Sequence, residues 1–160
     1  MKPINIGLMG VGTVGGGVAT VLKRNAEEIS RRAGRDIRLT IASRRNVEQA
    51  RELVGADVTV VADAFAVVNH PDVDIVVELI GGDTVAKELV LQAIANGKHV
   101  VTANKKLLAV HGNEIFARAQ EKGVMVAFEA AVAGGIPIIK ALREGLTANR
   151  IEWLAGIING

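Results

Sequence analysis

The sequence predicts a doubly wound α/β fold built on a mostly parallel sheet, and three observations lead to this prediction. First, segments typical of buried strands alternate with segments of helical periodicity along most of the chain. Second, aromatic residues make up only 2% of the 160 residues, so Val, Ile, Leu and Ala must fill the core, as in sheets buried on both faces. Third, a glycine-rich turn joins the first strand to the first helix. Repeated β-α-β units imply right-handed crossovers and hence parallel strands.

Six strands are expected, each a short apolar run bounded by turn residues. They are Ile4–Met9, Ile37–Ala42, Val58–Val61, Asp74–Ile80, His99–Thr102 and Val124–Phe128. Helical periodicity predicts helices from Val14 to about Arg32, over Val85–Ala95, and from about Lys106 to Lys122. In such a sheet, ligands bind at the carboxyl ends of the strands, so the segments that follow the strands carry the functional argument.

The turn after the first strand carries Gly10, Gly12 and Gly15 in the spacing G-x-G-x-x-G. In this motif the glycines make a tight turn, let the backbone approach a pyrophosphate and direct the next helix N-terminus at its charge. A small-residue turn in any α/β protein is the alternative interpretation. Because the motif lies between a first strand and a first helix, we expect a dinucleotide site and a Rossmann-like fold.

Two arginines follow the second strand, where NAD sites usually carry an acidic residue for the ribose 2′-hydroxyl. The segment is Ser43-Arg44-Arg45, and it contains no Asp or Glu. Guanidinium groups suit a 2′-phosphate through charge-assisted hydrogen bonds, although a solvated basic turn is the alternative. Arg44 and Arg45 therefore favour NADP over NAD without excluding NAD. Gly81 follows the fourth strand and is expected at the same cofactor site.

Lys105 follows the fifth strand, and the preceding Asn104 is suited to cap the next helix. At the edge of the predicted cleft, the Lys105 ammonium would contact a ribose, a phosphate or a carbonyl oxygen. The alternative is a solvated charge at a helix start. Glu78 stands in an apolar strand, and an unpaired buried carboxylate is costly, so we expect it near the strand end with a partner.

The segment that begins at Glu129 combines a carboxylate with small residues, two glycines and Pro137. Such a bend can turn backbone carbonyls inward beside Glu129. A carboxylate with carbonyl oxygens is a site for a hard cation. An inter-domain hinge is the alternative, and the residues by themselves favour the hinge.

Composition argues against several other classes of function. The formal net charge of +2 and the scarcity of aromatic residues argue against a nucleic-acid partner. No apolar run is long enough to span a bilayer, and we expect no secretory leader, no membrane partner and a cytoplasmic location. The chain has no Cys, which excludes a thiol nucleophile and a thiolate metal site within it.

Together these motifs resemble those of homoserine dehydrogenase. The likeness rests on the stretches Gly7–Gly15, Val77–Gly82, Gly97–Lys105, Phe128–Ile139 and Gly156–Gly160. The last three are much more specific than the glycine motif. The resemblance implies the NAD(P)-dependent interconversion of L-homoserine and L-aspartate 4-semialdehyde, in the pathway to threonine, methionine and isoleucine.

The resemblance also implies roles for individual residues. Thr13 and Val14 would contact the cofactor through their backbone, and Lys105 matches the family lysine at the cofactor and substrate interface. The family's monovalent cation site, usually a sodium site, is matched by Glu129, Val132, Gly134 and Ile136.

The family has a second, substrate-binding and dimerising domain that supplies the acidic substrate contacts and the general-acid lysine. We therefore expect an NAD(P)-binding domain over residues 1–133 and the truncated start of the α+β second domain over residues 134–160. Its first elements would be a connecting helix, Pro137–Leu146, and a strand, Ile151–Ile158. The fragment is expected to be inactive alone, and its full-length parent to be a homodimer acting on a small-molecule substrate.

Two other functions compete with this interpretation. A phosphorylating semialdehyde dehydrogenase would need a Cys nucleophile, which this chain does not contain. A non-catalytic NAD(P)-binding domain that senses redox state would have no need of the segment from Glu129 to Pro137.

Overall fold

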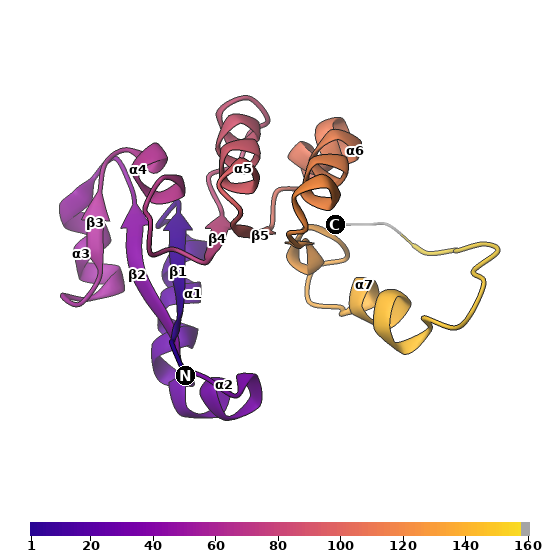
Figure 1. The fold of residues 1–160 in the computed structure, drawn as a ribbon, viewed down its shortest axis with the longest axis horizontal. Coiled ribbons are helices and arrows are strands. Elements are labelled where there is room, and N and C mark those ends of the chain that lie inside the picture. The colour runs from indigo at the N-terminus through magenta and orange to yellow at the C-terminus, as the bar shows by residue number, and fades with distance from the viewer. Residues whose placement is uncertain (158–160) are drawn as a thin grey trace.

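The computed structural model describes residues 1–157 and shows a six-stranded sheet flanked by helices (Figure 1). The strand order is β3-β2-β1-β4-β5-β6, and all neighbouring strands are parallel. This is the order produced by two mononucleotide-binding halves that meet between β1 and β4. The predicted doubly wound, Rossmann-like α/β fold is confirmed.

Each of the six predicted strands is present, although the third, fourth and sixth are shorter than expected. They are β1 (Ile4–Met9), β2 (Ile37–Ser43), β3 (Thr59–Val61), β4 (Ile75–Glu78), β5 (His99–Thr102) and β6 (Val126–Ala127). Their register aligns the carboxyl ends. Met9 of β1 pairs with Ser43 of β2 and with Glu78 of β4, and Glu78 pairs with Thr102 of β5. The segments that follow β1, β2, β4 and β5 therefore start along one edge of the sheet.

Helices cover both faces of the sheet. They are α1 (Thr13–Arg24), α2 (Ala26–Ala33), α3 (Val47–Val54), α4 (Ala64–Val68), α5 (Val85–Ala95), α6 (Lys105–Lys122) and α7 (Ile138–Lys140). Leu8 and Val77 belong to an apolar cluster with α1 and α3, whereas Met9 and Val76 belong to one with α4, α5 and α6. Consecutive strand residues thus serve opposite faces, as the pleat requires. No described helix combines the length and apolar character needed to cross a bilayer.

The single helix expected from Val14 to about Arg32 is wrong, because the chain breaks at Asn25 into α1 and α2. The Asn25 N–H still donates to the Val21 carbonyl, but its ψ of 19° ends the helix. α1 buries residues against the rest of the fold, whereas α2 buries none and carries exposed ion pairs of Glu28. Because α2 buries no residue, packing against the core does not hold it collinear with α1. The short helices α3 and α4 were not anticipated by the sequence reasoning.

The segment after β6 is helical over most of the expected helix Pro137–Leu146. A 3₁₀ turn (η1, Glu129–Ala131) leads to α7, which continues directly into a π-helical turn (η2, Ala141–Gly145). Within the expected strand Ile151–Ile158, residues 151–157 form no strand, and Ile158 lies outside the described residues. A strand needs a neighbouring strand to pair with. The edge strand β6 has only two residues, which already pair with β5 on one side, so it gives a further strand little length to pair with. Figure 1 shows α7 and the residues after it extending away from the sheet, on the α6 side.

Candidate functional site

A shallow pocket of about 170 Å³ marks the carboxyl edge of the sheet. It is lined by Val14, Leu79, Gly81, Ala103 and Asn104. These residues come from the start of α1 and from the turns after β4 and β5, so the structure brings together segments that are distant in sequence. Its position beside the junction of β1 and β4 is where doubly wound sheets bind nucleotides.

The three glycines of the motif serve different purposes. Gly10 has a φ of +95°, and a Cβ there would lie 2.7 Å from the Leu79 carbonyl oxygen. A Cβ at Gly15 would lie 2.1 Å from the Gly10 carbonyl oxygen. At Gly12, by contrast, a Cβ would meet no atom within 4 Å. The fold therefore needs glycine at the first and last positions, whereas the middle position faces open space of the kind a pyrophosphate would fill.

The N-terminus of α1 is left open by the described residues. Gly12 is its N-cap, and no side-chain hydrogen bond caps this end. The first N–H groups of a helix have no intrahelical partner, and the helix dipole gives this end a partial positive charge. By comparison, Asn46 caps α3 and Asn104 caps α6 through their side chains. The uncapped α1 end beside Gly12 is suited to an anion.

The turn after β2 contacts the glycine-rich turn. The Ser43 carbonyl accepts a hydrogen bond from the Gly10 N–H at 3.1 Å, and the Arg44 guanidinium donates to the Val11 carbonyl. Arg45 is exposed. Arg44 thus contacts the glycine-rich turn on the β1–β3 side of the edge, and Arg45 is the next residue.

The turn after β5 presents two lysines with different surroundings. Lys106 forms an ion pair with Asp83, at 3.0 Å between Nζ and Oδ1. The hydrogen bond from Lys106 holds the pKa of the Asp83 carboxyl below its ordinary value. Lys105 is exposed, and its ammonium forms no ion pair within residues 1–157. It follows Asn104, which accepts from the Leu107 N–H at 3.0 Å and so caps α6 as expected.

Glu78 has the partner that its place in an apolar strand demanded. It is the last residue of β4, it is fully buried, and its Oε2 accepts a hydrogen bond from the Thr102 hydroxyl at 2.7 Å. Its Oε1 accepts from the N–H groups of Ile80 and Gly81 at 2.8 and 3.1 Å. The carboxylate therefore holds the turn that contains Gly81.

Glu129 lies in a different place, two residues after β6, as the first residue of η1. Its Oε1 and Oε2 accept hydrogen bonds from the N–H groups of Ile139 and Lys140, both at 2.9 Å, so the carboxylate covers the start of α7. Between these points the chain makes a tight turn in which Ala133 and Gly134 have positive φ values of 55° and 58°. A non-glycine residue in this conformation is uncommon and is found where the surroundings impose it.

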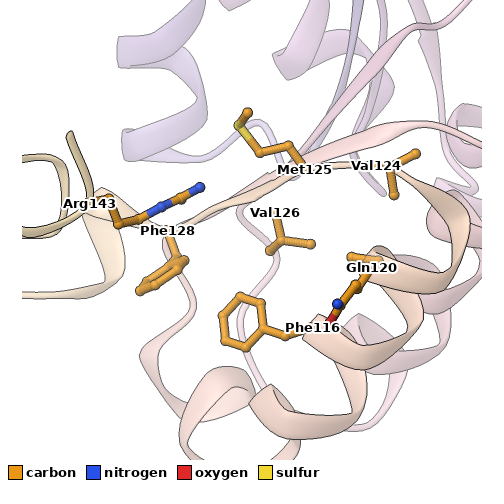
Figure 2. Close-up of a pocket in the computed structure, with 8 residues that line it drawn as sticks. Phe116, Gln120, Val124, Met125, Val126, Phe128 and Arg143 are labelled. Atoms are coloured by element: carbon orange, nitrogen blue, oxygen red, sulfur yellow. The ribbon is translucent and has the colours of Figure 1, made fainter. Parts of the chain in front are cut away.

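A larger hollow than the one at the sheet edge lies elsewhere in the described residues. It has a volume of about 390 Å³ and lies between α6, β6 and η2 (Figure 2). Phe116 and Phe128 line it with their ring centroids 5.1 Å apart, and Arg143 reaches over it. Its lining is mainly apolar and contains no carboxylate or histidine. We place the candidate site at the smaller pocket because it lies at the carboxyl ends of the strands, beside the glycine-rich turn and the turns after β4 and β5.

Sequence reasoning missed some of the groups that shape this edge. Asp83 and Lys106 are 23 residues apart, so the ion pair between their side chains could not be inferred from local spacing. Thr102 was named only as a strand end, although its hydroxyl holds Glu78. The available signal was Glu78 itself, since a buried carboxylate requires donors. The donors become identifiable only when the register of β4 and β5 is known.

Comparison with known proteins agrees with this geometry. The family model described as homoserine dehydrogenase, NAD binding domain, matches residues 10–129. The chain is 67% identical to a homoserine dehydrogenase of Pseudomonas aeruginosa over 160 residues, which is 100% of this chain and 36% of that protein. It is 64% identical to one of Neisseria gonorrhoeae over 160 residues, again 100% of this chain, and 37% of that protein.

Solved structures give the same result. The crystal structure of a homoserine dehydrogenase from Thiobacillus denitrificans matches with a TM-score of 0.93 and 71% identity, over 100% of this chain and 37% of that chain. That of S. aureus homoserine dehydrogenase at pH 7.5 matches with a TM-score of 0.75 and 37% identity, over 82% of this chain and 34% of that chain. The chain spans somewhat more than a third of the length of the curated relatives described above. It belongs to the homoserine dehydrogenase family and corresponds to the NAD-binding domain of that family.

Proposed function

We propose that this chain is the cofactor-binding part of a longer enzyme that interconverts L-homoserine and L-aspartate 4-semialdehyde by hydride transfer. The observation that carries the proposal is the open backbone at Gly12 beside the uncapped start of α1. This cradle fits the pyrophosphate of a nicotinamide dinucleotide, because backbone N–H groups and the helix dipole both favour the negative charge. Thr13 and Val14 supply the first N–H groups, with Gly10, Gly15 and Gly81 shaping the cleft around them.

The preferred cofactor is NADP, with NAD as the weaker ligand. Arg44 and Arg45 follow β2, where the fold usually binds the ribose 2′ position, and the chain has no acidic residue at that turn. The contact between Arg44 and the Val11 carbonyl supports this assignment, because it keeps a guanidinium next to the glycine-rich turn. Charge-assisted hydrogen bonds from guanidinium groups suit a 2′-phosphate.

We assign the electrostatic role in the reaction to Lys105. When bound, the reduced nicotinamide supplies the hydride for reduction of the semialdehyde carbonyl. Lys105 follows β5, in the half of the sheet that receives the nicotinamide, and its ammonium is exposed. A positive charge there stabilises the negative charge that develops on the carbonyl oxygen. The proton donor and the acidic substrate contacts belong to residues outside this chain.

A monovalent cation, sodium by preference, is proposed at the turn after β6. The ligands are one Glu129 carboxylate oxygen and the carbonyl oxygens of Val132, Gly134 and Ile136. An all-oxygen donor set with a single negative charge suits a hard cation. The positive φ values of Ala133 and Gly134 support the proposal, because they turn successive carbonyls within a few residues of Glu129.

The remaining proposals concern the longer protein. Residues 1–133 form the NAD(P)-binding domain, and residues 134–160 begin the domain that binds the substrate and mediates dimerisation. The full-length protein is a homodimer located in the cytoplasm. The chain alone is therefore inactive toward homoserine, although it retains cofactor binding. The products serve the synthesis of threonine, methionine and isoleucine.

The experiment compares Gly12→Asp with Gly17→Asp in a fluorescence titration with NADPH. Both glycines are exposed, and a Cβ at either would meet no atom within 4 Å, so both variants add the same charge without a clash. Aspartate is a favourable N-cap residue, so Gly12→Asp keeps α1 intact while it places a carboxylate where the pyrophosphate would lie.

We expect Gly12→Asp to weaken NADPH binding at least about 100-fold, which corresponds to about 2.7 kcal/mol. Gly17→Asp should change the affinity by less than about threefold, because its side chain lies a turn further along the helix. Thermal unfolding of both variants checks that they remain folded. Equal affinities of the two variants, or no NADPH binding by the unsubstituted chain at millimolar concentration, would overturn the cofactor assignment.

A further inference from the structure

The side chain of Glu78 needs an explanation that packing does not provide. It is 0% exposed, and the other residues of β4 are Ile75, Val76 and Val77. An apolar side chain would fill this place in a buried parallel strand, as it does at the neighbouring positions. Burying a carboxylate is costly unless its oxygens are paired. The reason for Glu78 therefore lies in the groups that its oxygens hold.

The first of these groups is the turn after β4. Glu78 Oε1 accepts hydrogen bonds from the N–H groups of Ile80 and Gly81 at 2.8 and 3.1 Å. Gly81 and Gly82 have φ values of +81° and +75°, and a Cβ at either would meet no atom within 4 Å. Two such glycines in open space have wide conformational freedom. The carboxylate restrains a turn that its own sequence leaves free.

The second group is the turn after β5. Glu78 Oε2 accepts from the Thr102 hydroxyl at 2.7 Å, and the same hydroxyl oxygen accepts from the Asn104 N–H at 3.0 Å. Thr102 is 1% exposed and Asn104 is 8% exposed, so these bonds are shielded from water. One carboxylate thus reaches two turns that lie more than twenty residues apart in sequence.

The Asn104 side chain closes the arrangement into a ring. Its Nδ2 donates to the Gly82 carbonyl at 2.6 Å, while its Oδ1 accepts from the Leu107 N–H at 3.0 Å. The ring runs from Glu78 through the first turn to Gly82, across to Asn104, and back through the Thr102 hydroxyl. Gly81 and Asn104 also line the pocket at the sheet edge, and Lys105 is the next residue.

We propose that Glu78 is a positioning residue whose buried carboxylate joins the Gly81-Gly82 turn to the Thr102–Lys105 turn. Through this ring the two turns form one rigid wall of the nicotinamide side of the cleft, and Lys105 is held in a single position. The proposal rests on the proposed function for the identity of the cofactor and the role of Lys105. The mechanical coupling of the two turns does not depend on it.

The test removes the Thr102 hydroxyl, a link in the ring that can be deleted without a change of shape. Thr102→Val has the same outline but no hydroxyl, and Thr102→Ser retains the hydroxyl. Glu78→Gln provides a second break, since one amide oxygen can still hold the Ile80 and Gly81 N–H groups while the link to Thr102 is disturbed. All variants are made in the full-length protein that contains this chain.

Lys98→Met is the matched control for general loss of stability. Lys98 is 5% exposed, and its Nζ donates to the His70 and Val73 carbonyls at 2.6 and 2.8 Å. It is also a buried charged residue that ties a loop to the sheet. Lys98 precedes β5, whereas Glu78 ends β4, so the loop that it holds lies at the opposite end of the parallel strands.

Four measurements are made on each variant: Tm, amide hydrogen exchange at Ile80 and Gly81, NADPH affinity, and kcat and KM for homoserine. In Thr102→Val we expect exchange at these amides to rise at least about tenfold, NADPH affinity to fall about threefold to tenfold, and kcat to fall about tenfold to thirtyfold. KM for homoserine should change by less than about threefold, because the substrate contacts lie elsewhere. Thr102→Ser should restore all values to within about twofold.

The outcomes separate coupling from stability and from the proposed function. If Thr102→Val and Lys98→Met both lower Tm but leave exchange at Ile80 and Gly81 unchanged, the positioning role is overturned. Faster exchange with unchanged kcat and affinity would also overturn it, since the turns would then be coupled without effect on the site. If the unsubstituted protein neither binds NADPH nor oxidises homoserine, the proposed function fails, while the exchange data still decide whether Glu78 couples the turns.

Discussion

The two halves of the sheet edge are built by different means. On the β1–β3 half, the glycine-rich turn and the start of α1 offer backbone groups, with no side-chain cap at Gly12. On the β4–β6 half, side chains connect the turns: the carboxylate of Glu78, the hydroxyl of Thr102 and the amide of Asn104. On the first half, Arg44 joins the turns after β1 and β2, but the start of α1 at Gly12 has no side-chain cap. On the second half, the side chains hydrogen-bond one another and form a ring.

This difference fits what each half is proposed to bind. A pyrophosphate is satisfied by any correctly oriented set of N–H groups, and a bare backbone lets it approach closely. A reacting carbonyl needs a charge fixed in one position, since a displacement of about 1 Å can cost about 100-fold in rate. A turn containing Gly81 and Gly82 does not provide such fixation by its own conformational preferences. We propose that the hydrogen-bonded ring supplies this fixation.

The largest effect is expected from Lys105→Ala in the full-length enzyme. Removing a charge that acts on the developing alkoxide should lower kcat/KM about 100-fold, or about 2.7 kcal/mol. Lys106→Ala is the matched control, because it removes the same charge one residue away from a side chain already paired with Asp83. We expect it to lower kcat/KM by at most about threefold.

Steady-state kinetics of homoserine oxidation with the cofactor at saturation measures both variants. Comparable losses in the two variants would mean that the site responds to the general positive field of the helix start. The two halves of the edge would then differ less than proposed, because the second half would also lack a specifically placed side chain.

An effect of similar or smaller size is expected on the first half, from Arg44→Ala combined with Arg45→Ala. The double variant should weaken NADP binding relative to NAD binding by about 1–3 kcal/mol, through loss of charge-assisted hydrogen bonds. NAD is the internal control, because loss of the Arg44 contact with the Val11 carbonyl disturbs the glycine-rich turn for both cofactors. Isothermal titration with both cofactors measures the ratio. An unchanged ratio of NADP to NAD affinity would mean that the arginines stabilise the turn and do not bind the 2′-phosphate.

The first half of the edge was largely predictable from the sequence, and the reason is local. Gly10, Gly12 and Gly15 lie within a few residues, so their spacing already describes one turn. The six strands were likewise visible as apolar runs, and the capping of α6 by Asn104 follows from the residue type and its place. Each of these features depends on neighbours in sequence.

The second half was predictable only in part, because its contacts are long-range. Glu78 could be flagged as a carboxylate that needs a partner, but Thr102 becomes that partner only through the register of β4 and β5. The break at Asn25 was missed for a related reason: helical residues continue on both sides of it, and only α1 has residues to bury. Likewise the backbone partners of Glu129 at the start of α7 are ten and eleven residues away.

The smallest effect is expected from the ion pair of Asp83 and Lys106, which joins the same two turns at the surface. The hydrogen bond from Lys106 lowers the pKa of Asp83 below its ordinary value of 3.8, and the positive charge of Lys106 acts in the same direction. A carboxyl whose pKa is lower in the folded state stabilises the fold above its unfolded pKa. This contribution is lost as the pH falls through the folded pKa. The relevant window therefore begins near pH 4 and extends below it.

Asp83→Asn should consequently lower the free energy of unfolding slightly at pH 5 to 7, and the difference from the unsubstituted chain should vanish in more acidic solution. Urea unfolding at a series of pH values measures it, and 1 M NaCl should reduce the difference at neutral pH because the pair is exposed to screening. Glu114→Gln is the matched control: the hydrogen bond from Lys87 likewise lowers the pKa of Glu114, but that pair joins the bodies of α5 and α6. Both variants should show the same acid dependence, and only Asp83→Asn should speed amide exchange at Gly81. A stability difference between Asp83→Asn and the unsubstituted chain that grows as the pH falls would contradict the lowered pKa of Asp83. Equal amide exchange at Gly81 in Asp83→Asn and Glu114→Gln would mean that only the buried ring of Glu78 holds the two turns together.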